Sequence, residues 1–231
     1  VVSGDIGCYT LGATPPLSAV HSTIDMGASL SVAHGLELAD VTGRTKRPVV
    51  GVIGDSTFAH SGITSLLGTV YNAGVGTLCI LDNRTTAMTG CQGNPCNGIT
   101  LHEQVRGANP LAVEKGKRLD IEALCRALGV DDVRSVDAQD YAAVKAALKQ
   151  ATGTDNLTVL VFHSPCRLID RSRDAVAVVN ECRACGKCVR IGCPAIGKDA
   201  EGRAVIDPTQ CIGCSQCVQV CPFGCISKEG E

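Results

Sequence analysis

Cysteines gather near the end of this sequence, where nine of the chain's 15 fall within residues 171–231. They form two runs of nearly the same spacing, C-x2-C-x2-C-x4-C-P and C-x2-C-x2-C-x3-C-P. Thiols two residues apart are awkward disulfide partners, but they are good joint ligands for one metal centre. The spacing therefore indicates metal chemistry in a reducing compartment, and we expect the chain to be cytoplasmic.

Three cysteines at this spacing, closed by Cys-Pro, are typical of bacterial-type ferredoxin domains that hold two [4Fe–4S] clusters. In such domains the fourth cysteine of each run ligates the other cluster. We therefore expect two ligand sets that cross between the runs. One set is Cys182, Cys185, Cys188 and Cys221, and the other is Cys211, Cys214, Cys217 and Cys193. Such clusters carry electrons one at a time.

Two features depart from the usual ferredoxin spacing. The first run has one residue more before Cys193, which a one-residue bulge at residues 191–192 would accommodate. Cys225 is a ninth thiol that has no ligand role in this scheme. Zinc in paired zinc ribbons is the alternative interpretation, but zinc patterns group cysteines in twos rather than threes. We therefore expect clusters rather than zinc.

The rest of the chain alternates between short apolar runs and helical patterns. The apolar runs predict strands at 48–53, 77–81, 133–136 and 157–162. The helical patterns cover 61–73, 120–128 and 138–150. This alternation predicts right-handed crossovers and a parallel sheet with helices on both faces. We expect an α/β domain at 1–165, a linker at 166–176 and a small α+β ferredoxin domain at 177–231.

Composition narrows the class of partner. Apolar residues make up 45% of the chain, which is enough for a sizeable core, and the formal net charge is −2. Without a basic excess, nothing points to nucleic acid. The longest apolar stretches, such as 157–162, are too short to span a bilayer. We therefore expect neither a nucleic acid nor a membrane as partner.

Polar residues follow two of the predicted strands at the points where those strands end. Gly54-Asp55-Ser56 follows the first, and Asp82-Asn83 follows the next. Ligands of parallel sheets bind at the carboxyl ends of strands, so Asp55 and Asn83 would face one crevice if the two strands are neighbours. Their oxygens suit Mg²⁺, which keeps further positions for phosphate oxygens and water. The alternative is a turn followed by a helix cap.

This pattern is a variant of the thiamine-diphosphate motif, in which Gly-Asp-Gly is followed by Asn after one crossover. Ser56 takes the place of the last glycine. Residues 4–12, 54–62 and 81–90 closely resemble segments of the large subunit of the indolepyruvate:ferredoxin oxidoreductases, and the cysteine-rich tail occupies the same place in that subunit. The chain is thus similar, over nearly its whole length, to the thiamine-dependent 2-oxoacid:ferredoxin oxidoreductases.

The resemblance implies a set of site residues. The side chains of Asp55 and Asn83 and the carbonyl of Thr85 would hold Mg²⁺ on thiamine diphosphate, and Cys8 would lie near the reacting carbon as a catalytic residue. The other cofactor-binding positions that it implies are Gly4, Asp5, Ile6, Gly7, Gly54, Ser56, Thr57, Met88, Thr89 and Gly90.

The resemblance also implies an activity, in an anaerobic metabolism. A 2-oxo acid, indolepyruvate or another arylpyruvate, would be oxidatively decarboxylated to an acyl-CoA, with coenzyme A as co-substrate and an external ferredoxin as electron acceptor. Pyruvate or a branched-chain 2-oxo acid is an alternative substrate. A non-catalytic electron-transfer module is the alternative from another functional class.

The family's large subunit has several hundred further residues before this region, including the domain that binds the aminopyrimidine ring and supplies the activating glutamate. The chain begins at Val1 without an initiator methionine. We therefore expect a fragment, a processed chain or a naturally split subunit. It would be active only in a hetero-oligomer with pyrimidine-binding and small (beta) subunits or domains.

Several further residues depart from the family or have no assigned role. His21 stands where the resemblance leads us to expect an acidic residue. Cys91 and Cys96 could line the substrate opening, form a redox pair or be ordinary loop thiols. His60 could act near the cofactor or pack at a helix start. Cys79, Cys125 and Cys166 fit buried structural thiols.

Overall fold

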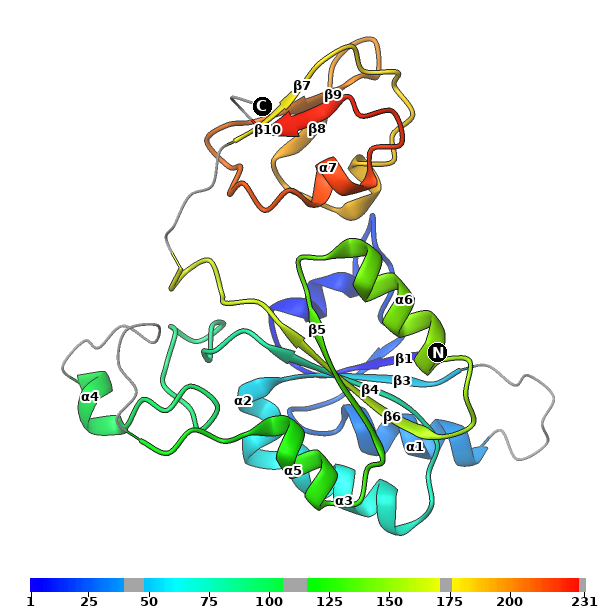
Figure 1. The fold of residues 1–231 in the computed structure, drawn as a ribbon, viewed down its shortest axis with the longest axis vertical. Helices are drawn as coiled ribbons and strands as arrows, with labels where there is room; N and C mark the ends of the chain where they lie inside the picture. Colours follow the sequence, from blue (N-terminus) through cyan, green and yellow to red (C-terminus); the bar gives the residue numbers. More distant parts are fainter. Residues whose placement is uncertain (40–47, 106–115, 171–175, 229–231) are drawn as a thin grey trace.

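The computed structural model describes residues 1–39, 48–105, 116–170 and 176–228. These form a larger α/β body and a smaller cysteine-rich body above it (Figure 1). Residues 171–175 of the predicted linker and the last three residues of the predicted ferredoxin domain lie outside the described residues. In the described part, no helix is long and apolar enough to cross a membrane.

A six-stranded sheet forms the centre of the larger body, in the order β2-β1-β3-β4-β6-β5. Every neighbouring pair of strands is parallel, which confirms the predicted parallel sheet. The strands are β1 (Val2–Gly4), β2 (Ser22–Thr23), β3 (Val50–Gly54), β4 (Gly76–Asp82), β5 (Asp132–Asp137) and β6 (Leu157–His163).

The helices of this body connect the strands and flank the sheet. They are η1 (Cys8–Ala13), α1 (Ser29–Ala39), α2 (Asp55–Thr57), η2 (Phe58–Gly62), α3 (Ile63–Tyr71), α4 (Leu101–Val105), α5 (Ile121–Ala127) and α6 (Tyr141–Ala151). The predicted helix at 138–150 begins later, at Tyr141, because the Asp140 side chain caps it by accepting the Ala143 N–H. The predicted helix at 61–73 is α3, and helical turns already begin at Asp55.

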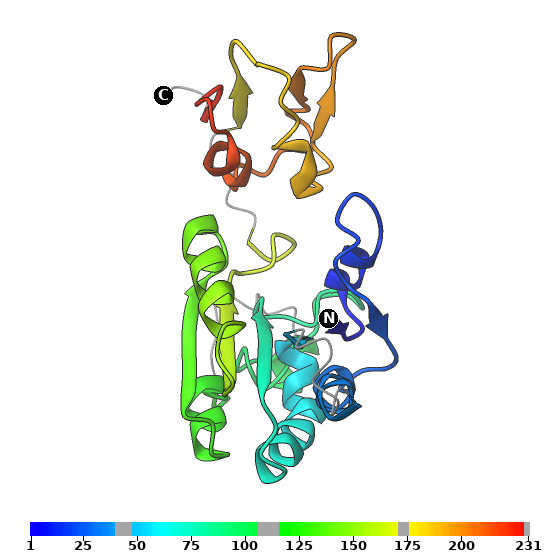
Figure 2. The ribbon, with the colours of Figure 1, turned by 90° about the vertical axis from the view of Figure 1, so that its right-hand side faces the viewer.

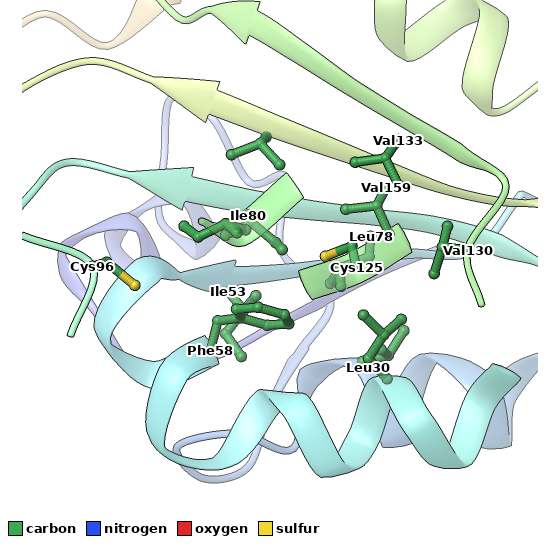
Figure 3. Packing of buried hydrophobic residues seen from close by; sticks show 13 residues of the cluster. Leu30, Ile53, Phe58, Leu78, Ile80, Cys96, Cys125, Val130, Val133 and Val159 are labelled. Carbon is green, nitrogen blue, oxygen red and sulfur yellow. The ribbon is translucent and has the colours of Figure 1, made fainter. Parts of the chain in front are cut away.

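The core occupies both faces of the sheet (Figure 2). On one face, α1, α3 and α5 bury a cluster that includes Leu30, Phe58, Leu66 and Cys125 (Figure 3). On the other face, α6 packs against a second cluster that contains Cys79. Each fully buried side chain of this size stabilises the fold by about 1.5–3 kcal/mol. Cys79 and Cys125 are therefore core residues, as expected.

The smaller body consists of two short pairs of antiparallel strands and two helical turns. Its elements are β7 (Ala177–Val179), η3 (Val189–Ile191), β8 (Ile196–Lys198), β9 (Ala204–Ile206), α7 (Gln216–Val220) and β10 (Ile226–Lys228). Strand β7 pairs with β10 and β8 with β9, which gives the expected small α+β unit. Its core is formed by small apolar side chains together with the cysteines themselves.

Candidate functional site

The carboxyl ends of β3 and β4 bring the two predicted polar segments together. The strands are direct neighbours, with Gly54 paired to Leu81 in the register. The chain leaves β3 at Asp55 and leaves β4 at Asp82 and Asn83. Asp55 and Asn83 were expected to face one crevice if their strands are neighbours, and the two strands do lie side by side.

Asp55 is the most unusual group at this edge. Its side chain is 2% exposed, and its Oδ2 has no hydrogen-bond partner among the residues that the structure describes. Burial, with a further contribution from the Asp82 charge, raises the pKa of Asp55 to about 7. A buried carboxylate oxygen without a partner is unfavourable unless a cation satisfies it. The site therefore fits the divalent cation that the sequence predicts.

Asn83 supplies a second oxygen at the same edge. Its Oδ1 accepts the Thr85 N–H at 3.1 Å, which folds residues 83–85 into a tight turn. An amide oxygen has two lone pairs, so one is still available to a metal ion. Thr85 is buried, and its hydroxyl donates to the Gln92 carbonyl at 3.3 Å. The turn is thus fixed from both sides.

A loop that sequence reasoning did not assign supports the turn. The Thr86 hydroxyl donates to Ser56 Oγ at 2.8 Å, which ties the two strand ends to each other. Asn97 donates from Nδ2 to the Arg84 carbonyl at 3.1 Å, and Asn94 hydrogen-bonds the Asp55 side chain. The only signal in the sequence is the density of Asn, Gly and Pro after Gly90.

The two loop cysteines occupy different environments. Cys96 is fully buried, and its thiol donates to the Asp55 carbonyl at 3.5 Å, so it packs against the backbone at the end of β3. Cys91 is half-buried, and burial together with the nearby Cys166 and Cys8 thiols raises its pKa. The two cysteines therefore differ in burial, although they lie in the same loop.

The loop at residues 4–8 lies beside the end of β3. Tyr9 accepts the Gly54 N–H through its hydroxyl oxygen at 3.0 Å, and Cys8 is exposed. A side chain at Gly4 would meet Val20 Cγ1 at 2.7 Å, so this position needs a glycine. Asp5 is fully buried and its carboxylate accepts the N–H groups of Ile6 and Gly27, so it organises the loop.

The remaining predicted positions are on the surface or in the backbone of this edge. Met88, Thr89 and Gly90 are exposed, and Thr89 is hydrogen-bonded to the side chain of Gln92. His60 is exposed within η2. The Nδ1 of His21 accepts the Val2 N–H. This hydrogen bond links the residue before β2 to the first residue of β1.

A polar cleft that the sequence did not indicate lies at the carboxyl ends of β4 and β6. Asp82, Arg118, Glu122 and His163 line it. His163 lies between the carboxylates of Asp82 and Glu122, at 2.9 and 2.8 Å. Hydrogen bonding to Asp82, the larger favourable cause, and to Glu122 raises the pKa of His163. These residues are 81 and 41 positions apart from His163 in the chain, so no local pattern could reveal them.

Each predicted cysteine quartet lines a cavity of its own. Cys193, Cys211, Cys214 and Cys217 line a cavity of about 940 Å³. Cys182, Cys185, Cys188 and Cys221 line a separate and much smaller one. The cavities therefore group the cysteines across the two runs, in the combination that two-cluster ferredoxins use.

Backbone N–H groups point at the sulfurs of the second of these cavities. Cys182 Sγ accepts the N–H of Ala184 and of Ala204, at 3.4 and 3.3 Å. Cys221 Sγ accepts the Cys225 N–H at 3.3 Å. Burial alone would raise the pKa of Cys221, but backbone donors outweigh it and lower that pKa. Such bonds favour thiolates and fit cluster ligation.

Cys225 lines the same cavity as the quartet of Cys182, Cys185, Cys188 and Cys221, although the predicted ligand sets leave it out. Its thiol donates to the Glu181 carbonyl at 3.4 Å. Across the described ranges, no three His, Cys, Asp or Glu side chains are grouped so as to hold a single metal ion.

Comparisons with protein families divide the chain in the same way. Residues 5–162 match the family described as "Thiamine pyrophosphate enzyme, C-terminal TPP binding domain". Residues 204–227 match the family described as "4Fe-4S binding domain". The first match contains Asp55 and Asn83. The second contains three cysteines of the larger cavity, Cys211, Cys214 and Cys217.

Curated relatives are similar over the whole chain. The indolepyruvate oxidoreductase subunit IorA of Pyrococcus horikoshii is 40% identical over 100% of this chain, and that of Thermococcus kodakarensis is 39% identical over the same share. The subunit from Methanothermobacter thermautotrophicus is 38% identical over 98% of the chain. The chain spans only 35–37% of the length of these relatives.

Among solved structures, a 2-oxoglutarate:ferredoxin oxidoreductase from Magnetococcus marinus has the same fold. It aligns with a TM-score of 0.56 over 71% of this chain and 53% of its own, at 16% identity. At this identity the likeness concerns the fold alone.

Proposed function

The chain belongs to the thiamine pyrophosphate enzyme family, and from that premise we propose that it is the diphosphate-binding and electron-transfer part of a 2-oxoacid:ferredoxin oxidoreductase. The observation that carries the proposal is the buried Oδ2 of Asp55, which has no hydrogen-bond partner among the described residues, at the end of the strand next to the one that Asn83 follows. A Mg²⁺ ion bridging to a diphosphate would satisfy that oxygen. The cysteine quartets then provide a route by which electrons leave.

The residues of the candidate site each have a defined task in this proposal. Asp55, Asn83 and the Thr85 carbonyl hold the Mg²⁺, while Ser56 and Thr57 present N–H and hydroxyl donors to phosphate oxygens at the start of the helical segment. When bound, thiamine diphosphate supplies a nucleophilic carbon and an electron sink for the loss of CO₂ from a 2-oxo acid. The loop at residues 4–8, with the exposed Cys8, covers the reacting side of the site.

The substrate that we propose is indolepyruvate or a related arylpyruvate. The support is that relatives 38–40% identical across this chain are subunits of indolepyruvate oxidoreductases. Coenzyme A accepts the acyl group, and an external ferredoxin accepts the electrons after they pass two [4Fe–4S] clusters. A cytoplasmic location agrees with the use of these thiols as ligands.

Further domains or subunits complete the site. The chain spans about a third of the length of its relatives, and an aminopyrimidine-binding region is needed to activate the cofactor. We therefore propose that catalysis requires a pyrimidine-binding part and a small subunit in a hetero-oligomer.

The test is an anaerobic preparation of this chain together with its partner chains. We expect bound iron, bound thiamine diphosphate and reduction of a one-electron acceptor that depends on coenzyme A and is fastest with indolepyruvate. The comparison substrates are phenylpyruvate, pyruvate, 2-oxoisovalerate and 2-oxoglutarate. Asp55→Asn should abolish thiamine diphosphate binding but retain the iron. Iron without thiamine diphosphate in the unmodified complex would exclude the enzymatic function, and a faster rate with another 2-oxo acid would exclude indolepyruvate.

A further inference from the structure

The two cysteine quartets differ in how they face the larger body. The cavity of Cys193, Cys211, Cys214 and Cys217 is also lined by Leu17, Tyr141 and Lys145, which belong to the α/β body. The cavity of the other quartet is lined by residues of the smaller body only. We call the first the inner quartet and the second the outer quartet.

Hydrogen bonds hold the inner quartet in this position. Helix α7, which carries Cys217, lies over the start of α6 in both ribbon views (Figures 1 and 2). Gln219 accepts the Tyr141 N–H at 2.8 Å and donates to the Gln139 carbonyl at 2.8 Å. Gln216 donates to the same carbonyl at 2.7 Å. Two glutamines on the same helix, α7, therefore bind the N-terminal end of α6 in one orientation.

The outer quartet instead meets solvent. Cys185 is exposed, and Phe223, which is 47% exposed, lies beside the quartet with the Arg183 guanidinium 5.0 Å from its ring centre. Both residues line the outer cavity. This face is thus open to another protein, whereas Tyr141 and Lys145 of α6 line part of the inner cavity.

Charge makes the difference between the quartets measurable. A cluster on four thiolates is negative, and reduction makes it more so, so a nearby cation favours the reduced form. Lys187 and Arg190 of the smaller body line the inner cavity. Lys145 lines it as well but comes from α6, so its charge reaches the inner quartet only when the two bodies are docked.

We propose that docking of α7 on α6 makes the inner cluster the one that receives electrons from the thiamine domain, and that Lys145 tunes its reduction potential across the domain boundary. An electron that moves outward oxidises the inner cluster by one electron and reduces the outer cluster by one. A one-electron acceptor protein then oxidises the outer cluster at the Arg183–Phe223 face. This inference rests on the proposed function, because it assumes two bound clusters.

The test is a redox titration of the anaerobically assembled complex, followed by electron paramagnetic resonance. Lys145→Gln should lower one of the two midpoint potentials and leave the other unchanged. Arg183→Gln, at the outer quartet, should lower the other one. The matched control is Lys149→Gln, which removes the same charge one turn further along α6, where the side chain does not line the cavity. It should shift neither potential.

A second variant tests the docking itself. Gln219→Ala should lower the same midpoint as Lys145→Gln, and it should speed hydrogen exchange at the Tyr141 amide, which loses its acceptor. If Lys145→Gln and Lys149→Gln shift the potentials equally, or if Lys145→Gln shifts neither, the inference is wrong. If the chain binds about eight iron atoms but shows no such shift, the inference alone is wrong. If the chain binds no iron, the proposed function is wrong.

Discussion

His163 lies with its Nδ1 2.9 Å from Oδ2 of Asp82, across the ends of β6 and β4. Asp82 is 2% exposed and directly precedes Asn83. Its other oxygen accepts the Arg84 N–H at 3.2 Å, and Arg118 lies 3.4 Å from Oδ2. One buried carboxylate therefore fixes the backbone on both sides of the proposed metal ligand.

The first prediction concerns this carboxylate. Asp82→Asn should weaken the affinity for Mg²⁺ and thiamine diphosphate by about 10–100-fold, because residues that orient a metal ligand have effects of that size. Calorimetric titration of the assembled complex with the cofactor measures this. The control is Asp132→Asn, which removes a partly exposed carboxylate from the far end of β5. Equal affinities for the two variants would exclude a positioning role for Asp82.

The second prediction concerns the pH dependence of stability. The pKa of His163 is raised above its ordinary 6.5, mainly because of its hydrogen bond to Asp82. A raised folded-state pKa contributes stability that is full below the unfolded value and is lost as the pH rises through the folded value. His163→Gln should therefore destabilise the protein most below about pH 6.5.

Urea denaturation at a series of pH values measures this difference in the free energy of unfolding. The gap between the unmodified chain and His163→Gln should shrink as the pH rises above 6.5. The imidazole is 35% exposed, so solvent limits the size of the gap. A gap that widens with rising pH would contradict the assigned partners of His163.

The sequence predicts the sheet better than the site. Strands β4 and β6 are apolar runs buried on both faces, and β3 is a shorter apolar run, so the apolar sequence identifies all three. Strands β1 and β2 have three and two residues, which is too short for any periodic pattern. Polar contacts such as Asp82 with His163 join residues 81 positions apart and leave no local signal. The cysteine quartets are predictable because metal ligation imposes a strict spacing.

The third prediction concerns the loop at residues 4–8. Tyr9→Phe removes the hydroxyl that accepts the Gly54 N–H at 3.0 Å. An unpaired and partly buried N–H should cost about 1 kcal/mol of stability. The loop should also come away from the end of β3 and weaken cofactor binding. The control is Tyr71→Phe, because that side chain is 86% exposed and should change neither stability nor cofactor affinity. If both variants behave alike, the Tyr9 contact has no role in holding the loop.

The fourth prediction separates the two ways of grouping the cysteines. Cys193 belongs to the first run in sequence but lines the cavity of Cys211, Cys214 and Cys217. Cys193→Ala should therefore destabilise the cluster of the second run, and the chain should lose about four of roughly eight iron atoms. The cluster that remains should have the same electron paramagnetic resonance spectrum as the one that remains in Cys211→Ala.

Two further variants make this comparison decisive. Cys182→Ala should leave the opposite cluster, since Cys182 lines the other cavity. Cys225→Ser should keep both, because Cys225 lines the outer cavity but is not one of the predicted ligands, and its thiol donates to the Glu181 carbonyl. If the spectrum of Cys193→Ala instead matches that of Cys182→Ala, each run holds its own cluster. In that case the crossed grouping is wrong, and the assignment of an inner and an outer quartet fails with it.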